Sequence, residues 1–362
     1  MGGVGGGRWW SVRCEGAGCE VVGCALVVRP CGREGQSEEH GRHAHTVSRR
    51  RVGSRGVATN PCIGAAILAA ALCSAARGAA RASCRRAALQ MLARLSPALD
   101  DDTRLQRIMP YVLSLVPDPS SAVRSKAVEV LADVAMLVRA FPPSEAKAFP
   151  EYVLPALSLL PADPEAGVRA TYAVHLARIA SAADTFLARA QLNASQEENQ
   201  SAGSGARGGT GDGSGGGSSA IGATGGGAAG IRFDEERAAL RIEVEQALQE
   251  LATPTDSHCS NRASSAAVDV AAVRRAVLRS AHALCGALGR RECAGFLLPM
   301  LITFLNDRDW QLRAAFFDEA AAIGAAAGGA AVEQFLLPCV ENTLCDPEEA
   351  VAAAALRCLA TM

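Results

Sequence analysis

A fixed spacing of proline, aspartate and arginine recurs along this chain and constrains its fold more than any other feature. In each copy a proline lies in an apolar stretch, an aspartate follows eight residues later, and an arginine follows six residues after the aspartate. The last copy has alanine in place of the arginine. A constant spacing within variable sequence is typical of stacked structural repeats. The copies are Pro110/Asp118/Arg124, Pro155/Asp163/Arg169, Pro299/Asp307/Arg313 and Pro338/Asp346/Ala352.

The first two copies each predict two helices joined by an Asp-Pro turn, at Asp118-Pro119 and Asp163-Pro164. The first helix should end at Asp118 or Asp163, because a residue that precedes proline disfavours helical geometry. We expect the aspartate to cap the second helix and the proline to occupy its first position. The second helices carry apolar residues at helical spacing: Val123, Ala127, Val130, Leu131 and Val134 in one, and Val168, Tyr172, Leu176 and Ile179 in the next.

An isolated helix pair cannot bury such an apolar face, but a stacked neighbour can. The sequence therefore predicts an all-α fold, an α-solenoid of antiparallel helix pairs of the HEAT or armadillo type. Arg274, Arg313 and Ala352 are 39 residues apart, which is the length of one such repeat.

Composition divides the 362 residues into four parts. Residues 1–60 are rich in Gly and Arg and show no sustained period, which predicts disorder or a wrongly assigned gene start. Helical patterning covers 61–195 and returns over 231–362. Residues 196–230, rich in Gly and Ser, predict a flexible linker that interrupts the array. The chain stops inside an apolar helix without a polar capping repeat, so we expect a truncated array.

The regularly placed charges have two interpretations. They are Asp118, Arg124, Asp163, Arg169, Asp307 and Arg313. They could form a charge ladder that binds a ligand, or each arginine could reach an aspartate in its own or the adjacent turn and tie the hairpins together. We favour the structural interpretation, because the spacing recurs whatever surrounds it. Partly exposed pairs of this kind contribute about 0–1 kcal/mol each to the free energy of unfolding. They would therefore fix the register of neighbouring helix pairs more than they would stabilise the fold.

Other candidate sites are weak. Cys19 and Cys24 with His40 and His45 loosely match a zinc-finger spacing, but the stretch between them lacks the apolar residues of a finger core. We predict no metal site. The thirteen cysteines are too dispersed for a small disulfide scaffold. We interpret those in apolar helical stretches as free thiols in a reducing compartment; they are Cys285, Cys339, Cys345 and Cys358.

Composition and motifs also argue against catalysis. A net charge of −1 gives no electrostatic reason to expect nucleic-acid binding. Neither kinase signatures nor a phosphate-binding loop is present, and no nucleophile is paired with a base. We predict that this chain is not an enzyme, has no catalytic or cofactor-binding residues, and functions through its shape.

Four segments carry a resemblance to a known family. They are 87–111, 149–155, 168–180 and 302–318, and the last contains Trp310 with the adjacent Phe316 and Phe317. These aromatic residues are not generic repeat residues, and with Pro155 of the second segment they are the family-signature residues. From about residue 62 to 362 the chain resembles the helical middle of the regulatory subunit of class III phosphatidylinositol 3-kinase, the vacuolar-protein-sorting protein kinase-like subunit.

The resemblance implies a scaffold, because that family has a kinase or pseudokinase domain, a helical-repeat middle and a propeller, and only the middle is similar here. The implied partners are the class III lipid kinase catalytic subunit and its autophagy and sorting regulators. The implied role is to support phosphatidylinositol 3-phosphate production. The implied location is cytoplasmic, peripheral on endosomal, autophagic or vacuolar membranes through the complex alone.

Two alternatives stay open. The chain could be the HEAT-repeat scaffold of a serine/threonine protein phosphatase, although the 45-residue step from Arg124 to Arg169 is less uniform than that group shows. It could also be a fragment of a larger serine/threonine protein kinase whose kinase domain is absent from this sequence.

Overall fold

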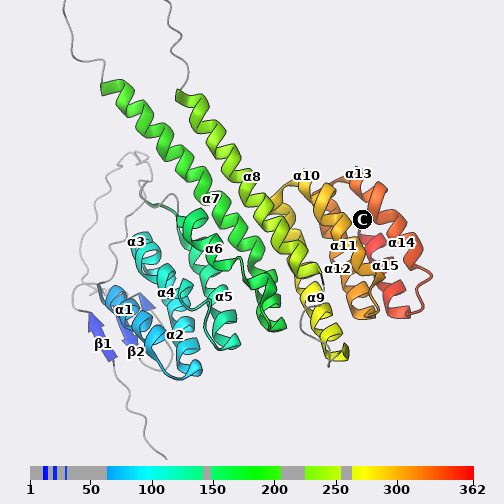
Figure 1. The fold of residues 1–362 in the computed structure, drawn as a ribbon, viewed down its shortest axis with the longest axis horizontal. Helices are drawn as coiled ribbons and strands as arrows, with labels where there is room; N and C mark the ends of the chain where they lie inside the picture. The colour runs from blue at the N-terminus through cyan, green and yellow to red at the C-terminus, as the bar shows by residue number, and fades with distance from the viewer. Residues whose placement is uncertain are drawn as a thin grey trace, which may run out of the picture.

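The chain forms an α-solenoid of antiparallel helix pairs, as the repeats predict (Figure 1). The computed structural model describes residues 11–14, 19–22, 29–30, 63–141, 148–204, 225–253 and 263–362. One layer holds the second helix of each pair, and each of these helices packs against the next along the stack. They are α2 (Ala82–Leu95), α5 (Ser121–Leu137), α7 (Ala166–Ser204), α9 (Ala263–Leu288), α12 (Trp310–Ala327) and α15 (Glu349–Thr361).

The other layer holds the first helix of each pair. It begins with α1 (Ile63–Gly78), which residues 79–81 connect to α2. Later members are built from short pieces, with the 3-10 turn η1 (Ser96–Ala98) leading into the first of them. These pieces are α3 (Asp101–Thr103), η2 (Arg104–Ile108) and α4 (Met109–Leu113); η4 (Phe149–Val153), α6 (Leu154–Leu157) and η5 (Leu160–Ala162); α10 (Arg290–Glu292), η6 (Cys293–Leu297), α11 (Leu298–Ile302) and η7 (Thr303–Asn306); and α13 (Gly329–Ala331), η8 (Val332–Leu336) and α14 (Leu337–Thr343). The exception is α8 (Gly225–Ala252), which is one continuous helix.

The repeated proline explains why these first helices are broken into pieces. Pro110, Pro155, Pro299 and Pro338 are each the second residue of an α-helical piece that directly follows one π-helical turn. A proline inside a helix lacks the N–H donor, and its ring clashes with the carbonyl four residues earlier. The wider π turn accommodates this clash. The proline therefore sets a bend at the same point of every repeat.

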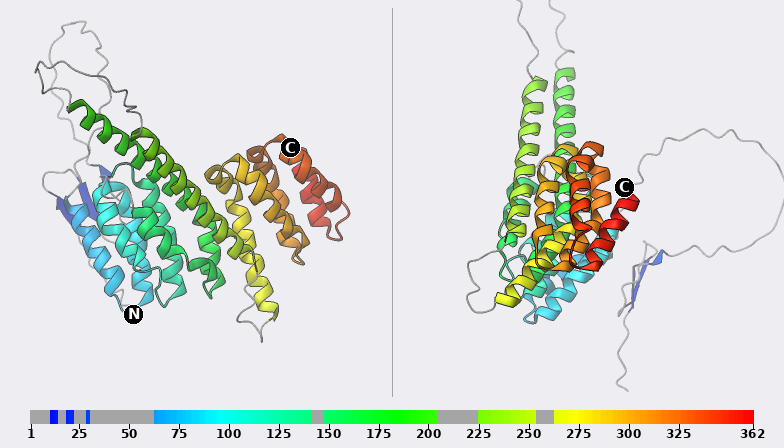
Figure 2. Two further views of the ribbon diagram at one scale, coloured as in Figure 1. Left: turned by 45° about the horizontal axis from the view of Figure 1, so that its top comes forward. Right: turned by 90° about the vertical axis from the view of Figure 1, so that its right-hand side faces the viewer.

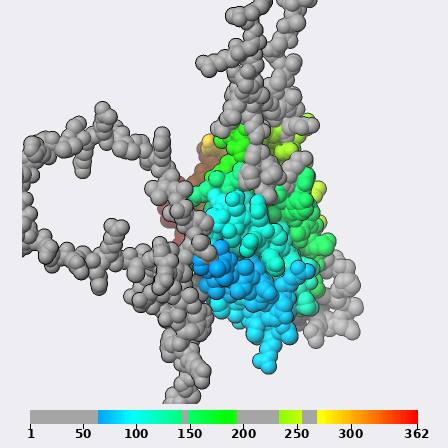
Figure 3. All heavy atoms as spheres, turned by 90° about the vertical axis from the view of Figure 1, so that its left-hand side faces the viewer, coloured from blue at the N-terminus to red at the C-terminus, as the bar shows by residue number. Residues whose placement is uncertain are grey.

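Figure 2 shows the helix layers from two further sides, and the core of buried side chains lies between them. All nine residues predicted for the apolar faces of α5 and α7 are buried. At the junction of these helices, the Phe186 ring stacks on Phe141, with centroids 4.4 Å apart, and contacts Phe149. Alanines supply much of the remaining buried surface, so the helices approach closely with few large side chains. Seen from the N-terminal end, α1 and the first copy of the repeat form the front of the array (Figure 3).

The turn between the two helices corrects the predicted capping. The chain leaves helical geometry before Asp118, as expected, but α5 starts at Ser121 with Ser120 as its N-cap. The Asp118 carboxylate accepts the N–H of Ser120 two residues on, which closes a turn ahead of the helix. Both carboxylate oxygens are further occupied by Arg85. The prediction that the aspartate caps the helix and the proline starts it is therefore wrong.

The insert lies between α7 and α8, the second helix of one pair and the first helix of the next (Figure 1). Both helices run beyond the rest of the array and extend into the segment 196–230, for which a flexible linker is predicted. Helix α7 ends at Ser204 and α8 begins at Gly225. The Gln and Glu residues that start this segment favour helix, and residues 205–224 lie outside the described part.

A small antiparallel sheet was not anticipated by the sequence analysis. Strands β1 (Ser11–Cys14), β2 (Cys19–Val22) and β3 (Arg29–Pro30) lie side by side in chain order, with Ser11 opposite Val22 and Glu20 opposite Arg29. The other residues of 1–60 lie outside the described part, so disorder there stays a prediction. Within the described residues, no helix has the length and apolarity required to cross a membrane.

Candidate functional site

The predicted ladder exists, and its rungs join neighbouring repeats. Arg124 donates from Nε and Nη2 to the two carboxylate oxygens of Asp163, both at 2.8 Å. Arg313 makes the same bidentate contact with Asp346 at 2.9 Å. Planar guanidinium and carboxylate groups match in this geometry, which gives directional contacts as well as charge attraction. The structural interpretation of the repeated charges is therefore the one the geometry supports.

Two further rungs were missed by the sequence analysis. Arg85 pairs with both oxygens of Asp118 at 2.8 Å, and Arg274 reaches Asp307 at 2.6 Å. In both rungs, as in the Arg313 rung, 33 residues separate the partners. This constant separation is present in the sequence, where Arg85 and Arg274 precede Asp118 and Asp307 by the same interval.

Each arginine also binds the main chain of its own repeat. The Nη1 groups of Arg124 and Arg313 donate to the carbonyl oxygens of Asp118 and Asp307, both at 2.9 Å. Arg169 donates to the carbonyl of Asp163 in the same way. One guanidinium therefore joins the turn of its own pair to the turn of the next, which fixes how the two pairs stack.

The aspartates are held equally firmly from their own side. The N–H groups of Ser120, Glu165, Asp309 and Glu348 donate to the aspartate two residues earlier, each at 2.9 Å. Every ladder carboxylate is thus preorganised before the arginine arrives, so little conformational entropy is lost when the rung forms.

Burial and hydrogen bonding act in opposite directions on these carboxylates. Burial raises the pKa of Asp118, but the hydrogen bonds from Arg85 and from the Ser120 N–H outweigh it, and the net shift is downward. The hydrogen bond from Arg313 is the largest effect on Asp346 and lowers its pKa. The side chains of Arg124 and Asp163 are 12% and 8% exposed. The ion pair between Arg124 and Asp163 is therefore more buried than the partly exposed pairs for which a contribution of about 0–1 kcal/mol is expected.

The ladder is interrupted where the insert enters the array. Arg169 contacts no carboxylate among the described residues, whereas Arg124 before it and Arg274 after it both do. Arg274 instead receives an additional partner, because its Nε donates to the Ala252 carbonyl at the end of α8. Its guanidinium also lies over the Phe304 ring, 5.3 Å from the centroid. Among the described residues, the rungs thus form two series, one on each side of the insert.

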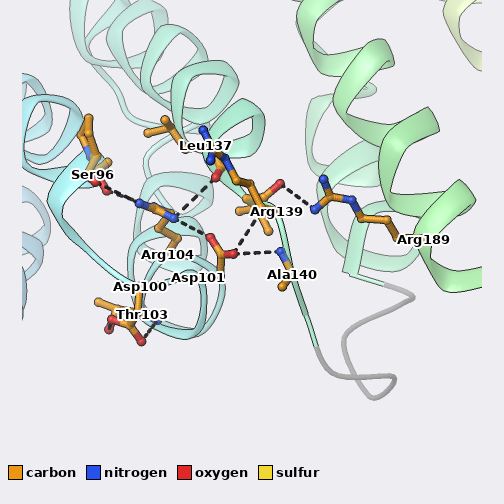
Figure 4. Close-up of polar contacts among 11 residues, drawn as sticks. Ser96, Asp100, Asp101, Thr103, Arg104, Leu137, Arg139, Ala140 and Arg189 are labelled. Atoms are coloured by element: carbon orange, nitrogen blue, oxygen red, sulfur yellow. Dashed lines mark hydrogen bonds and ion pairs between the residues drawn. The ribbon is translucent and has the colours of Figure 1, made fainter. Parts of the chain in front are cut away.

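A second polar cluster joins the opposite ends of the helices (Figure 4). The buried Arg104 donates to the Ser96 carbonyl at 2.9 Å, to the Leu137 carbonyl at 3.5 Å and to Asp101. The other oxygen of Asp101 accepts the N–H groups of Arg139 and Ala140 at 3.1 and 2.8 Å. This cluster ties the start of the first helix to the end of α5 in the same pair. No sequence signal identified it, because neither charge recurs at the repeat spacing.

In the C-terminal half, Arg290 occupies the corresponding place and donates to the Ala327 carbonyl at 3.1 Å. Gly328 follows with φ of 99°, and a Cβ added there would lie 2.0 Å from Nη2 of Arg290. Glycine is needed at this position both for its backbone conformation and for the space that the guanidinium fills.

Most of the family-signature residues serve the core. Phe316 and Phe317 are buried side by side in α12, with ring centroids 5.2 Å apart in an edge-to-face arrangement. Trp310, the first residue of α12, is 41% exposed. Pro155 follows the π turn η4, like the other repeat prolines.

The cysteine interpretation needs one correction. Cys285 and Cys293 form a disulfide with Cα atoms 5.0 Å apart, because the turn at Gly289 returns the chain from α9 to η6. The interpretation of Cys285 as a free thiol is therefore wrong, whereas Cys339, Cys345 and Cys358 are free. In the part that the structure describes, no group of side chains is suited to hold a metal ion, and the weak zinc spacing involving His40 and His45 extends outside it.

Comparison with known proteins identifies a family. The model for the PIK3R4-like middle domain matches residues 68–362. The chain is 38% identical over 268 residues to the serine/threonine-protein kinase VPS15 of Arabidopsis thaliana, and 32% over 275 residues to the probable serine/threonine-protein kinase vps15 of Dictyostelium discoideum. These alignments cover 71% and 75% of this chain but 16% and 12% of the relatives. A designed armadillo repeat protein of known structure is 15% identical, with a TM-score of 0.36 over 80% of this chain and 98% of that one.

Proposed function

The chain belongs to the PIK3R4-like family, whose middle domain it matches, and we propose that it serves as a non-catalytic scaffold within a class III phosphatidylinositol 3-kinase complex. The observation that carries the proposal is the ladder. Its arginines and aspartates, the regularly placed charges of the chain, bind one another and the main chain. Because these side chains bind within the protein, they fix how neighbouring repeats stack. The protein therefore acts through the surface that the stacked repeats form.

In this proposal the chain holds the lipid kinase catalytic subunit together with its sorting and autophagy regulators, and so supports phosphatidylinositol 3-phosphate production. It works in the cytoplasm and reaches endosomal, autophagic or vacuolar membranes only through the complex. The relatives are named as protein kinases, and this chain spans less than a fifth of each. Any phosphoryl transfer is proposed to belong to regions outside this middle domain.

Co-purification tests the proposal. The tagged full-length gene product would be isolated from its own cells, and co-purifying proteins would be identified by mass spectrometry. We expect the class III lipid kinase catalytic subunit at near-stoichiometric yield. Its absence, with a phosphatase catalytic subunit recovered instead, would replace this proposal with the phosphatase-scaffold alternative.

A matched pair of variants makes the test specific to the array. Arg124→Ala removes a ladder rung between α5 and the turn before α7, while Arg178→Ala removes an exposed ion pair with Asp133 that connects the same two repeats. We expect the first variant to reduce recovery of the lipid kinase and the second to leave it unchanged. Equal recovery with both would show that the ladder does not organise the binding surface.

A further inference from the structure

A groove opens on the first-helix layer where the insert interrupts the array. There α8 replaces the short broken helix of the other repeats and lies beside α7 and η5 (Figure 1). The groove consists of a cavity of about 260 Å³ and a smaller one of about 80 Å³, which share Leu154 and Glu243 in their lining. Its floor is apolar, formed by Leu154, Leu176, Ile179, Leu240, Val244 and Leu187.

One edge of the groove is a row of carboxylates. Glu236, Glu243 and Glu250 line it from α8. They are seven residues apart, so they lie on one face of the helix at intervals of about 10 Å. All three are exposed, and none forms an ion pair with another described residue. Two basic residues of α8 are used elsewhere, since Arg237 pairs with Asp184 and Arg241 lies 3.9 Å from Glu292.

A tyrosine side chain in the same groove is largely buried. Tyr172 of α7 is 5% exposed and lines the larger cavity. Its hydroxyl makes no hydrogen bond to any residue that the structure describes. Burial, with Glu243 and Glu250 nearby, raises the pKa of Tyr172, so the group stays a neutral donor. No buried side-chain oxygen of the described residues lacks a hydrogen-bond partner, so the Tyr172 hydroxyl opens to the cavity, where the oxygen of a ligand can accept its hydrogen bond.

The lining contains no lysine, arginine or histidine among the described residues. A ligand for this groove must therefore bring apolar surface for the floor, positive charge for the row of glutamates, and an acceptor for the tyrosine hydroxyl. An amphipathic helix with basic residues seven apart supplies the first two at matching intervals. Its side-chain or main-chain oxygens supply the third.

We propose that this groove binds a basic amphipathic helix of a partner protein. The apolar face of the bound helix covers the floor, and its Lys or Arg side chains pair with the glutamates of α8. Complementary charge of this kind speeds encounter and fixes the position of the bound helix. The inference does not require the lipid kinase as partner, so peptide binding and co-purification can succeed or fail independently.

A labelled peptide of about 18 residues, with leucines on one face and lysines every seven residues, is the probe. Its affinity for the full chain is measured by fluorescence anisotropy. The test variant is the triple change Glu236→Gln, Glu243→Gln and Glu250→Gln. The control carries Glu235→Gln, Glu333→Gln and Glu341→Gln, which alter exposed glutamates outside the groove and change the net charge equally.

Exposed ion pairs each change an equilibrium constant by a factor of about two to four, so we expect the test variant to bind about tenfold more weakly. The control should bind within about twofold of the unmodified chain, and added salt should weaken binding. Tyr172→Phe should weaken binding with the circular dichroism spectrum unchanged, because it removes only the hydroxyl.

Two results would overturn the proposal. One is equal binding by the test and control variants, or by a peptide of the same composition whose lysines are redistributed around the helix. That result would mean general charge attraction. The other is a dimer of the unmodified chain in light scattering that becomes a monomer in the test variant, because a second copy of this chain would then be the occupant.

Discussion

Removing the rung between Arg124 and Asp163 gives the sharpest test of how the repeats are held together. Both side chains are close to nine-tenths buried, and they share two hydrogen bonds of 2.8 Å. After Arg124→Ala, the carboxylate of Asp163 keeps only the N–H of Glu165 as a described partner. A buried charge that loses its partner costs about 3 kcal/mol. That exceeds the value of about 0–1 kcal/mol expected for an exposed pair.

The assay is a double-mutant cycle of Arg124→Ala and Asp163→Ala, with the free energy of unfolding measured by urea titration. We expect a coupling energy of about 2 kcal/mol, less than the single-variant loss because part of that loss is the stranded carboxylate. The matched control is the cycle of Arg178→Ala and Asp133→Ala, whose side chains are 39% and 36% exposed. Its coupling should be below about 0.5 kcal/mol. Equal coupling in the two cycles would refute the argument that burial gives the ladder its strength.

Three further measurements test other parts of the fold. Gly328→Ala should lower the free energy of unfolding by about 2 kcal/mol, because a residue with a side chain is strained at φ of 99°. The control is Gly329→Ala, which has open space at Cβ and should be neutral or stabilising. Phe316→Ala should cost about 3–5 kcal/mol at a fully buried position, and Trp310→Ala less than about 1 kcal/mol; equal losses would contradict the assigned burial. Hydrogen bonding lowers the pKa of Asp346, so this carboxylate binds fewer protons in the folded state than in the unfolded state. The stability that it contributes is therefore present above about pH 4 and is lost as the pH falls below that value. The difference in unfolding free energy between the unmodified chain and Asp346→Asn should therefore shrink on acidification, and a constant difference would exclude the mechanism.

Much of the fold was predictable because a solenoid is built from local contacts. Apolar periodicity identified the buried faces of α5 and α7, and the repeat spacing identified the positions of Asp163, Arg169 and Arg313. The capping prediction failed because it treated each turn in isolation. Asp118 is held by Arg85, from the preceding helix pair, and that competition for the carboxylate cannot be seen within one repeat.

The sequence by itself determined that this chain stacks helix pairs, since the proline, the turn and the apolar face recur at a spacing that only neighbouring repeats can satisfy. It also placed the insert between repeats. Only the tertiary structure decided which aspartate each arginine binds, that Arg169 has no described carboxylate partner, and that α8 brings its glutamates beside Tyr172. The physical reason is that local propensity and periodicity act within one helix, whereas these contacts depend on how far one helix pair is displaced from the next.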